Sequence, residues 1–334
     1  GVPVIAVGRI HDPLVAEEIV AQGRADMVSM GRASIVDPDL PNKALAGQFD
    51  EVKPCIACLQ GCIGKLLSKD LFMSCLVNPA VGRERERVPR PAARRKRVII
   101  AGAGPAGLEA ARVAAIRGHE VHLLEKEAVI GGQFRLAAIP PAKQDIANVL
   151  HYYSIQMGRL RVNLRLRTEA TTDVVMGLNP DAVVVATGGA PIIPNLPGVN
   201  GANVVTAHDV IAGRATTGDR VLIIGGGMVG CETADYLAER GKHVTVVEML
   251  EDVAMDVQDA VKFFLMRRLN GYGVKFVTSA TVREITANGV KVDIGGRVEE
   301  ITGMDTIVLA VGARPVNTLA RELEGKVPEL YVIG

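Results

Sequence analysis

Short apolar runs alternate along this chain with amphipathic stretches, and glycines separate many of them. Near the N-terminus, an apolar run over residues 2–7 is followed by a helical pattern over 13–22. A second apolar run, over 25–29, precedes another helical stretch. This order of hydrophobic and polar positions predicts strands that alternate with helices. Repeats of this length are typical of a (β/α)8 barrel, so we expect residues 1–50 to form the end of one.

Farther along, the same alternation occurs twice with a glycine-rich turn between strand and helix. The first copy has Gly-Ala-Gly-Pro-Ala-Gly at 102–107, and its second strand ends at Glu125. The second copy has Gly-Gly-Gly-Met-Val-Gly at 225–230 and ends at Glu248. In a dinucleotide fold, such glycines permit a tight turn, close approach of the pyrophosphate and helix–strand packing, while the acid accepts ribose hydroxyls. The pattern therefore predicts two dinucleotide sites, with electron transfer between their ligands.

These elements predict an α/β protein in which helices cover sheets, with two nested Rossmann-like domains. The expected divisions are a barrel end over 1–50, a cysteine-rich segment over 51–80, a basic linker over 81–96, a first dinucleotide domain over 97–216 and 301–334, and a second over 217–300. We expect one buried sheet to contain Val98, Ile100, Val183, Val185, Val308 and Leu309. The chain starts and stops within apolar runs, so we expect it to be a piece of a longer protein.

The composition is that of an ordinary globular protein. Hydrophobic residues make up 48% of the 334 positions and charged residues 22%, which excludes a mainly disordered chain. The 38 lysines and arginines nearly balance the 37 acidic residues, so the net charge of +1 offers no field for nucleic acid or an anionic membrane. No apolar run approaches the roughly 20 residues of a membrane span. We expect a cytoplasmic protein, and the sequence leaves homo-oligomer formation open.

Four of the five cysteines lie close together in the sequence. Cys55, Cys58, Cys62 and Cys75 have the spacing C-x2-C-x3-C-x12-C, which favours a metal centre over disulfides in a cytosolic chain. A triplet on a tight loop with one distant cysteine favours a [4Fe-4S] cluster. Zinc is an alternative, although zinc sites usually pair two C-x2-C hooks, and a redox dithiol at Cys55 and Cys58 is another. The fifth cysteine, Cys231, is expected to be a buried apolar residue.

Four further motifs carry a family resemblance. They are Gly-Gly-Gln at 131–133, Val-Val-Val-Ala-Thr-Gly at 183–188, Pro-Asn-Leu-Pro-Gly at 194–198 and Ala-Val-Gly-Ala-Arg-Pro at 310–315. These motifs resemble the FAD/NAD domains of two-dinucleotide flavoprotein reductases. Together with the cysteine quartet and the Gly-Arg pairs at 8–9 and 31–32, the whole order resembles the C-terminal half of old-yellow-enzyme-type iron–sulfur flavoproteins. That family includes 2,4-dienoyl-CoA reductase, 2-enoate reductase, NADH:flavin oxidoreductases, and trimethylamine and histamine dehydrogenases.

The resemblance implies binding residues for four cofactors, although without this context the Gly-Arg pairs would be ordinary turns. The backbone of Gly8, Arg9, Gly31 and Arg32 would hold the FMN phosphate, and Cys55, Cys58, Cys62 and Cys75 would ligate [4Fe-4S]. FAD would bind at Gly102, Gly104, Pro105, Ala106, Gly107, Glu125, Lys126, Gly132, Gln133, Thr187 and Gly188. The nicotinamide dinucleotide would face Gly225, Gly227, Gly230 and Glu248, and Gly312 is a further cofactor-binding candidate.

The same resemblance implies an oxidoreductase that passes electrons from NADH through FAD and [4Fe-4S] to FMN and then to an activated C=C bond of the 2-enoate or 2,4-dienoyl-CoA type. Its partners would be this small-molecule substrate and the nicotinamide dinucleotide. The family's first six barrel strands, which carry the substrate acid and base, have no counterpart here, so no catalytic residue is named. The Asp of the family's Gly-Asp pair would follow Gly334. We therefore expect a fragment that is incomplete for turnover.

Four alternatives bear on this function. Glu248 would accept a ribose hydroxyl and repel a 2′-phosphate, and Glu251 and Asp252 add negative charge, so NADH is expected rather than NADPH. An amine dehydrogenase would instead send electrons outward from FMN, and the intact turn at 225–227 argues against it. A chain without turnover could act as a nucleotide-binding or electron-relay module. A disulfide reductase is disfavoured because neither dinucleotide fold carries a cysteine pair.

Overall fold

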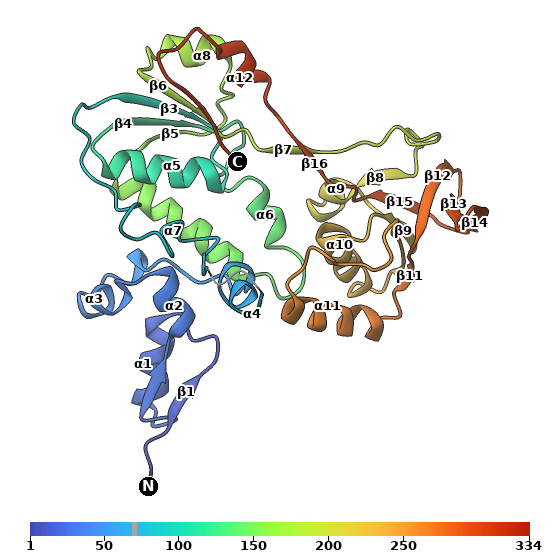
Figure 1. Cartoon of the computed structure of the whole chain (residues 1–334), viewed down its shortest axis with the longest axis horizontal. Coiled ribbons are helices and arrows are strands. Elements are labelled where there is room, and N and C mark those ends of the chain that lie inside the picture. The colour runs from blue at the N-terminus through green and yellow to red at the C-terminus, as the bar shows by residue number, and fades with distance from the viewer. Residues whose placement is uncertain (69–71) are drawn as a thin grey trace. The chain divides into compact units, whose positions relative to one another are not determined.

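The computed structural model of this protein describes residues 1–68 and 72–334 (Figure 1). The chain forms two compact units that interleave in sequence. The first unit comprises Gly1–Ala138, Asp145–Gly188 and Val316–Gly334. The second comprises Ile139–Gln144 and Gly189–Pro315. The short stretch Ile139–Gln144 therefore leaves the first unit, joins the second and returns.

The N-terminal region of the first unit contains two parallel strands and three helices. In chain order they are β1 (Ile5–Val7), α1 (Pro13–Ala21), β2 (Met27–Ser29), α2 (Gly31–Val36) and α3 (Leu40–Leu45). Helix α1 begins where the sequence predicts, because the Asp12 carboxylate accepts a hydrogen bond from the Leu14 N–H at 2.8 Å. The pair Gly31-Arg32 starts α2.

The cysteine segment has little regular structure among its described residues. It is bordered by η1 (Phe49–Glu51), a short 3-10 helix. It then contains η2 (Gln60–Gly64), a π-helical turn, and α4 (Lys65–Leu67). The π-helical turn follows two left-handed residues, Ala57 and Leu59, so the chain coils tightly between the cysteines.

The larger part of the first unit is a parallel sheet in the order β17-β6-β3-β4-β5. Its strands are β3 (Arg97–Ala101), β4 (Glu120–Leu124), β5 (Asn163–Arg165), β6 (Ala182–Val185) and β17 (Leu330–Val332). Its helices are α5 (Pro105–Ile116), α6 (Gln133–Ala137), α7 (Asp145–Arg159), α8 (Thr172–Gly177) and α12 (Thr318–Leu323). Helices α5 and α7 cover one face of the sheet, and α8 and α12 cover the other (Figure 1).

Strand β3 shows why these strands are apolar along their whole length. Val98 and Ile100 pack on one face, in the same cluster as Leu108 of α5. Ile99 packs on the opposite face, in the same cluster as Val175 of α8. Because successive side chains of a strand point to opposite faces, both sets need to be hydrophobic when helices cover both faces.

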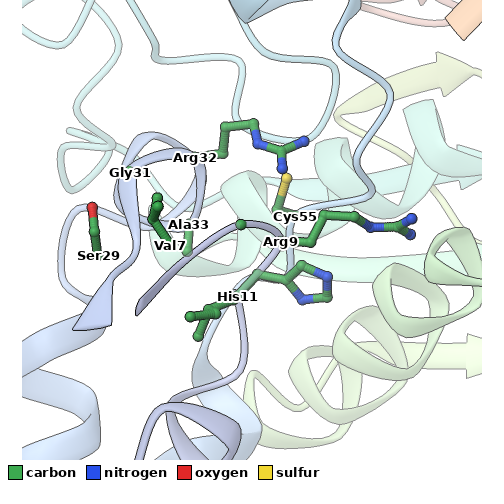
Figure 2. Close-up of a pocket in the computed structure, with 10 residues that line it drawn as sticks. Val7, Arg9, His11, Ser29, Gly31, Arg32, Ala33 and Cys55 are labelled. Atoms are coloured by element: carbon green, nitrogen blue, oxygen red, sulfur yellow. The ribbon is translucent and has the colours of Figure 1, made fainter. Parts of the chain in front are cut away.

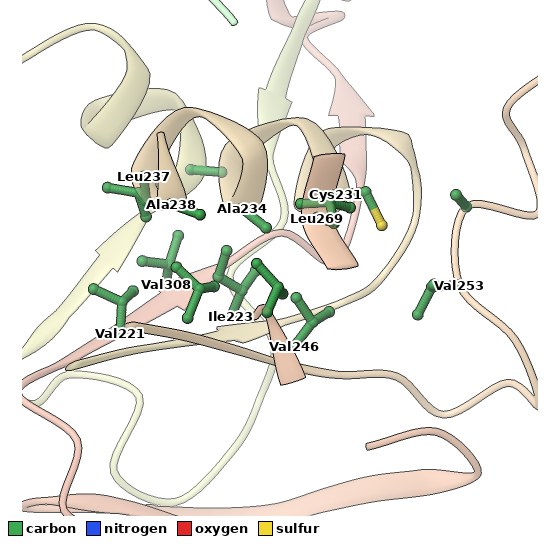
Figure 3. Packing of buried hydrophobic residues seen from close by; sticks show 14 of the residues in the cluster. Val221, Ile223, Cys231, Ala234, Leu237, Ala238, Val246, Val253, Leu269 and Val308 are labelled. Carbon is green, nitrogen blue, oxygen red and sulfur yellow. The ribbon is translucent and has the colours of Figure 1, made fainter. Parts of the chain in front are cut away.

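The second unit contains another parallel sheet, in the order β11-β10-β9-β15-β8. Its strands are β8 (Val204–Thr206), β9 (Arg220–Ile224), β10 (His243–Val247), β11 (Lys275–Val277) and β15 (Thr306–Leu309). Helices α9 (Ala207–Ile211), α10 (Met228–Ala238) and α11 (Asp259–Gly271) belong to the same unit. Val221 and Ile223 of β9 pack against this helical layer, and Figure 3 shows them beneath Ala234 and Leu237 of α10. Cys231 is fully buried in this core, as the sequence predicts.

The opposite face of this second sheet is covered by β-structure. An antiparallel sheet is formed by β12 (Ala280–Thr286), β13 (Gly289–Ile294) and β14 (Arg297–Thr302). Leu222 and Ile224 of β9 pack in the same cluster as Val290 of β13. A separate two-stranded ribbon pairs β7 (Gly189–Pro191) with β16 (Ala313–Pro315). Among the described residues, no helix combines the length and the apolar character that a bilayer crossing requires.

One sheet expectation is wrong. Val308 and Leu309 lie on β15, which pairs with β9 in the second unit and not with the sheet that contains Val98 and Val183. Strand β15 occupies the place in the second sheet that β6 occupies in the first, because each pairs with the strand that leads into its own glycine-rich turn. Strand β15 lies within the stretch Gly189–Pro315 of the second unit, which also includes Ile139–Gln144.

Candidate functional site

The first glycine-rich turn joins β3 to α5. Gly102 has a positive φ of +104°, and a Cβ there would lie 2.4 Å from the carbonyl oxygen of Ala186. A Cβ on Gly107 would lie 1.9 Å from the carbonyl oxygen of Gly102. By contrast, apart from its two chain neighbours, no described heavy atom lies within 4 Å of the place for a Cβ on Gly104, the residue before α5. The turn is therefore tightly packed at Gly102 and Gly107 and open at Gly104, beside the helix N-terminus. An anion-binding turn needs this open side.

The Glu125 carboxylate lies under this turn. Its Oε2 accepts a hydrogen bond from the Ala103 N–H at 2.8 Å, and its Oε1 accepts one from the Glu127 N–H at 2.9 Å. The residue is only 7% exposed, and Lys126 beside it is exposed. Because each carboxylate oxygen has a second lone pair, Glu125 can still accept hydroxyl donors while the backbone holds its orientation.

Two loops from elsewhere in the first unit approach the same turn. The Gly131 N–H donates to the Ala103 carbonyl at 2.8 Å, and a Cβ on Gly132 would lie 3.2 Å from the Cα of Gly104. Gln133 then begins α6. In the second loop, Thr187 donates its hydroxyl to the Val316 carbonyl at 2.6 Å. The Gly188 carbonyl accepts from the Val316 N–H. The structure thus gathers the residues predicted for FAD in one unit.

The second unit repeats this arrangement between β9 and α10. A Cβ on Gly230 would lie 1.9 Å from the Gly225 carbonyl oxygen. The Glu248 carboxylate accepts from the Gly226 N–H at 2.5 Å and from the Leu250 N–H at 2.9 Å. The residue is 8% exposed. The two turns therefore share their backbone geometry. In each, the last glycine packs against the carbonyl of the first, and an amide of the turn donates to the buried glutamate. Gly312 also lies in this unit, where its carbonyl accepts from the Ile192 N–H.

A close backbone contact links the residue before Cys75 with the residue before Cys62. Ser74 donates its N–H to the Gly61 carbonyl at 2.7 Å, and a Cβ on Gly61 would lie 2.5 Å from the Ser74 carbonyl oxygen. Cys55 is buried, and the other three cysteines of this segment are half-buried. Cys58 and Cys75 both pack against the apolar cluster that contains Cys55. Gly61 belongs to no motif singled out in the sequence, although its place between two cysteines is a usable signal.

Backbone amides point at several of these thiols. The Ala57 N–H donates to the Cys55 sulfur at 3.4 Å, and the Val77 N–H donates to the Cys75 sulfur at 3.4 Å. Burial raises the pKa of the Cys55 and Cys58 thiols, while the Ala57 amide and nearby Arg32 favour the Cys55 thiolate. Four soft thiol donors, with N–H groups directed at Cys55 and Cys75, are the kind of donor set that an iron–sulfur cluster takes. Among the described residues, no three His, Cys, Asp or Glu side chains are grouped so that they could hold a metal ion.

An open pocket of about 220 Å³ lies beside the cysteine segment. Both Gly-Arg pairs line it, and so does Cys55. Figure 2 shows the Arg32 guanidinium turned toward the Cys55 sulfur. The Arg9 guanidinium forms an ion pair with Asp145, the first residue of α7. The pocket therefore brings together the residues predicted for the FMN phosphate and one predicted cluster ligand.

A buried charged network, which the sequence analysis missed, joins the cysteine segment to α5. Glu109 accepts hydrogen bonds from Arg112 at 2.7 Å and from the Tyr153 hydroxyl at 3.0 Å. The Lys53 ammonium lies 3.9 Å from the Glu109 carboxylate and 5.6 Å from the centre of the Tyr152 ring. Burial lowers the pKa of Lys53 to about 8 and raises the pKa of Tyr152 to about 12. Single buried polar residues have no sequence periodicity, so no pattern marked them.

Comparisons with known proteins agree with this geometry. The model of the pyridine nucleotide-disulphide oxidoreductase family matches residues 96–330. The model of the NADH:flavin oxidoreductase / NADH oxidase family matches residues 1–51. The first match includes both glycine-rich turns, and the second includes both Gly-Arg pairs.

Individual relatives match the chain along its length. It is 40% identical to an NADH oxidase from Thermoanaerobacter brockii and 35% identical to a cinnamate reductase from Clostridium sporogenes, in both cases over 100% of this chain. A solved structure of 2-naphthoyl-CoA reductase with 2-naphthoyl-CoA superposes on 99% of the chain with a TM-score of 0.95 at 38% identity. The chain spans about half the length of these proteins: 52%, 50% and 51%, respectively.

Proposed function

This chain belongs to the pyridine nucleotide-disulphide oxidoreductase family, and from that premise we propose that it is the electron-input part of an NADH-dependent flavin and iron–sulfur oxidoreductase. The observation that carries the proposal is the duplicated turn. In each unit, a buried glutamate, Glu125 or Glu248, accepts hydrogen bonds from the backbone of its own glycine-rich turn. Two such sites in one chain suit a pair of dinucleotides that exchange a hydride.

FAD is assigned to the first unit. The open backbone at Gly104 would face the pyrophosphate, and Glu125 would accept the ribose hydroxyls. Gly132, packed against Gly104, would let the following loop and Gln133 close over the phosphates. Thr187 and Gly188, tied to Val316, would close over the bound FAD. When bound, FAD supplies hydride acceptance and single-electron release.

A [4Fe-4S] cluster is assigned to Cys55, Cys58, Cys62 and Cys75. The amides of Ala57 and Val77 would stabilise the thiolate ligands, and the Gly61–Ser74 contact would hold the fourth ligand in place. When bound, such a cluster carries one electron at a time. The buried network around Glu109 would fix the cysteine segment against α5, whose N-terminus faces the FAD site.

FMN is assigned to the pocket beside Cys55. Backbone groups of Gly8, Arg9, Gly31 and Arg32 would hold its phosphate, and the guanidinium of Arg32 adds positive charge. Strands β1 and β2 have exposed apolar side chains, among them Val7 and Met27. Under this proposal, further strands of a (β/α)8 barrel cover those side chains and complete the FMN site.

The second turn is assigned to NADH. Glu248 would accept the adenosine ribose hydroxyls and disfavour a 2′-phosphate at the same place. Lys262, the first basic residue after Glu248 in the sequence, is paired with Asp252 at 2.6 Å, which lowers the positive charge available to a phosphate. NADH is therefore the proposed donor.

The substrate class proposed is an unsaturated acid or acyl thioester with an activated C=C bond. The cinnamate reductase and 2-naphthoyl-CoA reductase relatives support this class, because their names specify conjugated carboxyl compounds. The acid and base that act on the substrate are not assigned to residues of this chain.

An absorption spectrum of the purified protein, before and after anaerobic addition of NADH, tests the proposal. We expect flavin bands with a broad iron–sulfur shoulder, and bleaching of the flavin by NADH. Flavin that NADH does not reduce would contradict the assignment of the second turn. A sample that binds neither flavin nor iron after anaerobic reconstitution would contradict the proposed cofactor set.

A further inference from the structure

An acidic side chain lies at the N-terminus of α10, where the second turn is expected to receive pyrophosphate. The Asp256 carboxylate accepts a hydrogen bond from the Met228 N–H at 2.8 Å. A Cβ on Gly227 would lie 3.4 Å and 3.6 Å from the two carboxylate oxygens of Asp256. An anion at this place uses the same N–H groups and the same helix dipole as a bound phosphate would.

The first unit differs at the corresponding position. Gln133 follows Gly102 by 31 residues, and Asp256 follows Gly225 by 31 residues. A glutamine has a neutral amide that can donate to a phosphate oxygen, whereas a carboxylate can only accept and carries a like charge. The two turns therefore share their glycines and glutamates but not the group that borders the helix N-terminus.

The loop that carries Asp256 is anchored beside the turn, while the carboxylate itself is exposed. Ala254 donates its N–H to the Gly226 carbonyl at 2.7 Å and is fully buried. Val253 is buried in the core of the second unit. Asp256 is exposed, so a rotation of its side chain can vacate the helix N-terminus without moving the anchored backbone.

We propose that Asp256 occupies the pyrophosphate position of the second turn in the ligand-free protein and has to be displaced when the nicotinamide dinucleotide binds. This inference rests on the proposed function of that turn. Displacement costs the hydrogen bond to Met228 and the favourable interaction with the helix dipole. Because the binding-competent state is only a fraction of the ligand-free population, Asp256 weakens the apparent affinity for the dinucleotide.

Calorimetric titration of the full chain with NAD⁺ tests this proposal, since the oxidised dinucleotide has the same pyrophosphate but cannot reduce a flavin. Asp256→Ala removes both the charge and the acceptor, and we expect it to bind NAD⁺ about three- to tenfold more tightly. Asp256→Asn keeps the acceptor without the charge, so we expect a smaller gain. Asp259→Ala is the matched control, because Asp259 is an exposed acid at the start of α11 and makes no assigned contact with the turn.

Thermal unfolding separates this role from that of a simple helix cap. If Asp256 acts only as a helix cap, Asp256→Ala lowers the unfolding temperature and leaves the affinity for NAD⁺ unchanged or weaker. That result would overturn the proposal. The proposal predicts a lower ligand-free unfolding temperature together with a larger upward shift on addition of NAD⁺. Absence of NAD⁺ binding by the wild type and by every variant would instead overturn the proposed function of the second turn, and this inference with it.

Discussion

Ser74 donates its backbone N–H to the carbonyl oxygen of Gly61 at 2.7 Å, and this bond joins the two parts of the cysteine segment. Gly61→Ala would place a Cβ 2.5 Å from the Ser74 carbonyl oxygen, so the backbone has to shift. Overpacking of this kind costs about 1–3 kcal/mol. We expect the variant to lose most of its iron while it retains FAD, as measured by iron assay and flavin absorbance.

The matched control for this variant is Gly158→Ala. Gly158 is exposed on α7, and beyond the adjoining backbone of its own helix no described heavy atom lies within 4 Å of the place for its Cβ. We expect it to keep its iron and to be slightly more stable, because alanine favours a helix. Equal iron contents in the Gly61 and Gly158 variants would contradict the role of the Gly61–Ser74 contact.

A second prediction concerns the ion pair between Lys143 and Glu232 in the second unit. Their charged atoms lie 2.6 Å apart, and the side chains are 23% and 12% exposed. Lys143→Met leaves the Glu232 carboxylate buried without its partner, so we expect the free energy of unfolding to fall by about 2 kcal/mol. The double variant with Glu232→Met should recover most of that loss, as measured by urea denaturation.

The exposed ion pair between Lys262 and Asp252 supplies the comparison. Asp252 is 58% exposed, so Lys262→Met is expected to cost less than about 1 kcal/mol. If Lys143→Met is no more destabilising than Lys262→Met, the buried pair does not hold Ile139–Gln144 on α10.

A third prediction concerns the choice of dinucleotide. The Glu248 carboxylate is held by the Gly226 and Leu250 amides, so it cannot easily move away from a 2′-phosphate. We expect flavin reduction to favour NADH over NADPH by at least about tenfold, because like charges at close range are repulsive. Glu248→Gln should narrow this preference strongly, whereas Glu251→Gln, which removes only one of the additional negative charges, should narrow it much less. A tenfold preference of the wild type for NADPH would refute the assignment.

A fourth prediction concerns acid sensitivity of the second unit. The hydrogen bond from the Arg220 side chain, with backbone N–H donors of Arg220 and Asp219, lowers the pKa of Asp305 from 3.8 to about 2. Since the folded value lies below the unfolded value, the stabilisation is fully present above pH 3.8 and is lost as pH falls toward about 2. The unfolding temperature of Asp305→Asn should therefore lie below that of the wild type at neutral pH.

The same two proteins are compared at low pH. The difference in unfolding temperature between the wild type and Asp305→Asn should shrink as pH falls from 3.8 toward about 2. Asp259→Asn, an exposed acid outside this contact, serves as the control and should show little difference at any pH. A constant difference down to pH 2 would mean that the Asp305 charge does not contribute.

The local parts of the candidate site could be predicted from the sequence. The two turns at 102–107 and 225–230, and the acids that follow them, were located because a tight turn, a helix start and a short strand are determined by neighbouring residues. The burial of Cys231 was predicted for the same reason, since it lies on the apolar face of a helix that starts at a recognisable turn. The cysteine spacing indicated a metal centre, and its assignment to a cluster stays a prediction.

Sheet membership and the charged contacts could not be predicted, because they depend on pairing between residues far apart in the chain. Strand β15 is equally apolar whichever sheet it joins, so the sequence could not assign Val308 to the second unit. Nor could it place Asp256 at the N-terminus of α10 or Lys143 beside Glu232, since a single polar residue has no periodic signal. The sequence by itself determined the two dinucleotide folds, because local backbone geometry and apolar periodicity are properties of short segments. The tertiary structure decided sheet membership and the charged contacts, because strand pairing and the burial of a charge are properties of the folded chain.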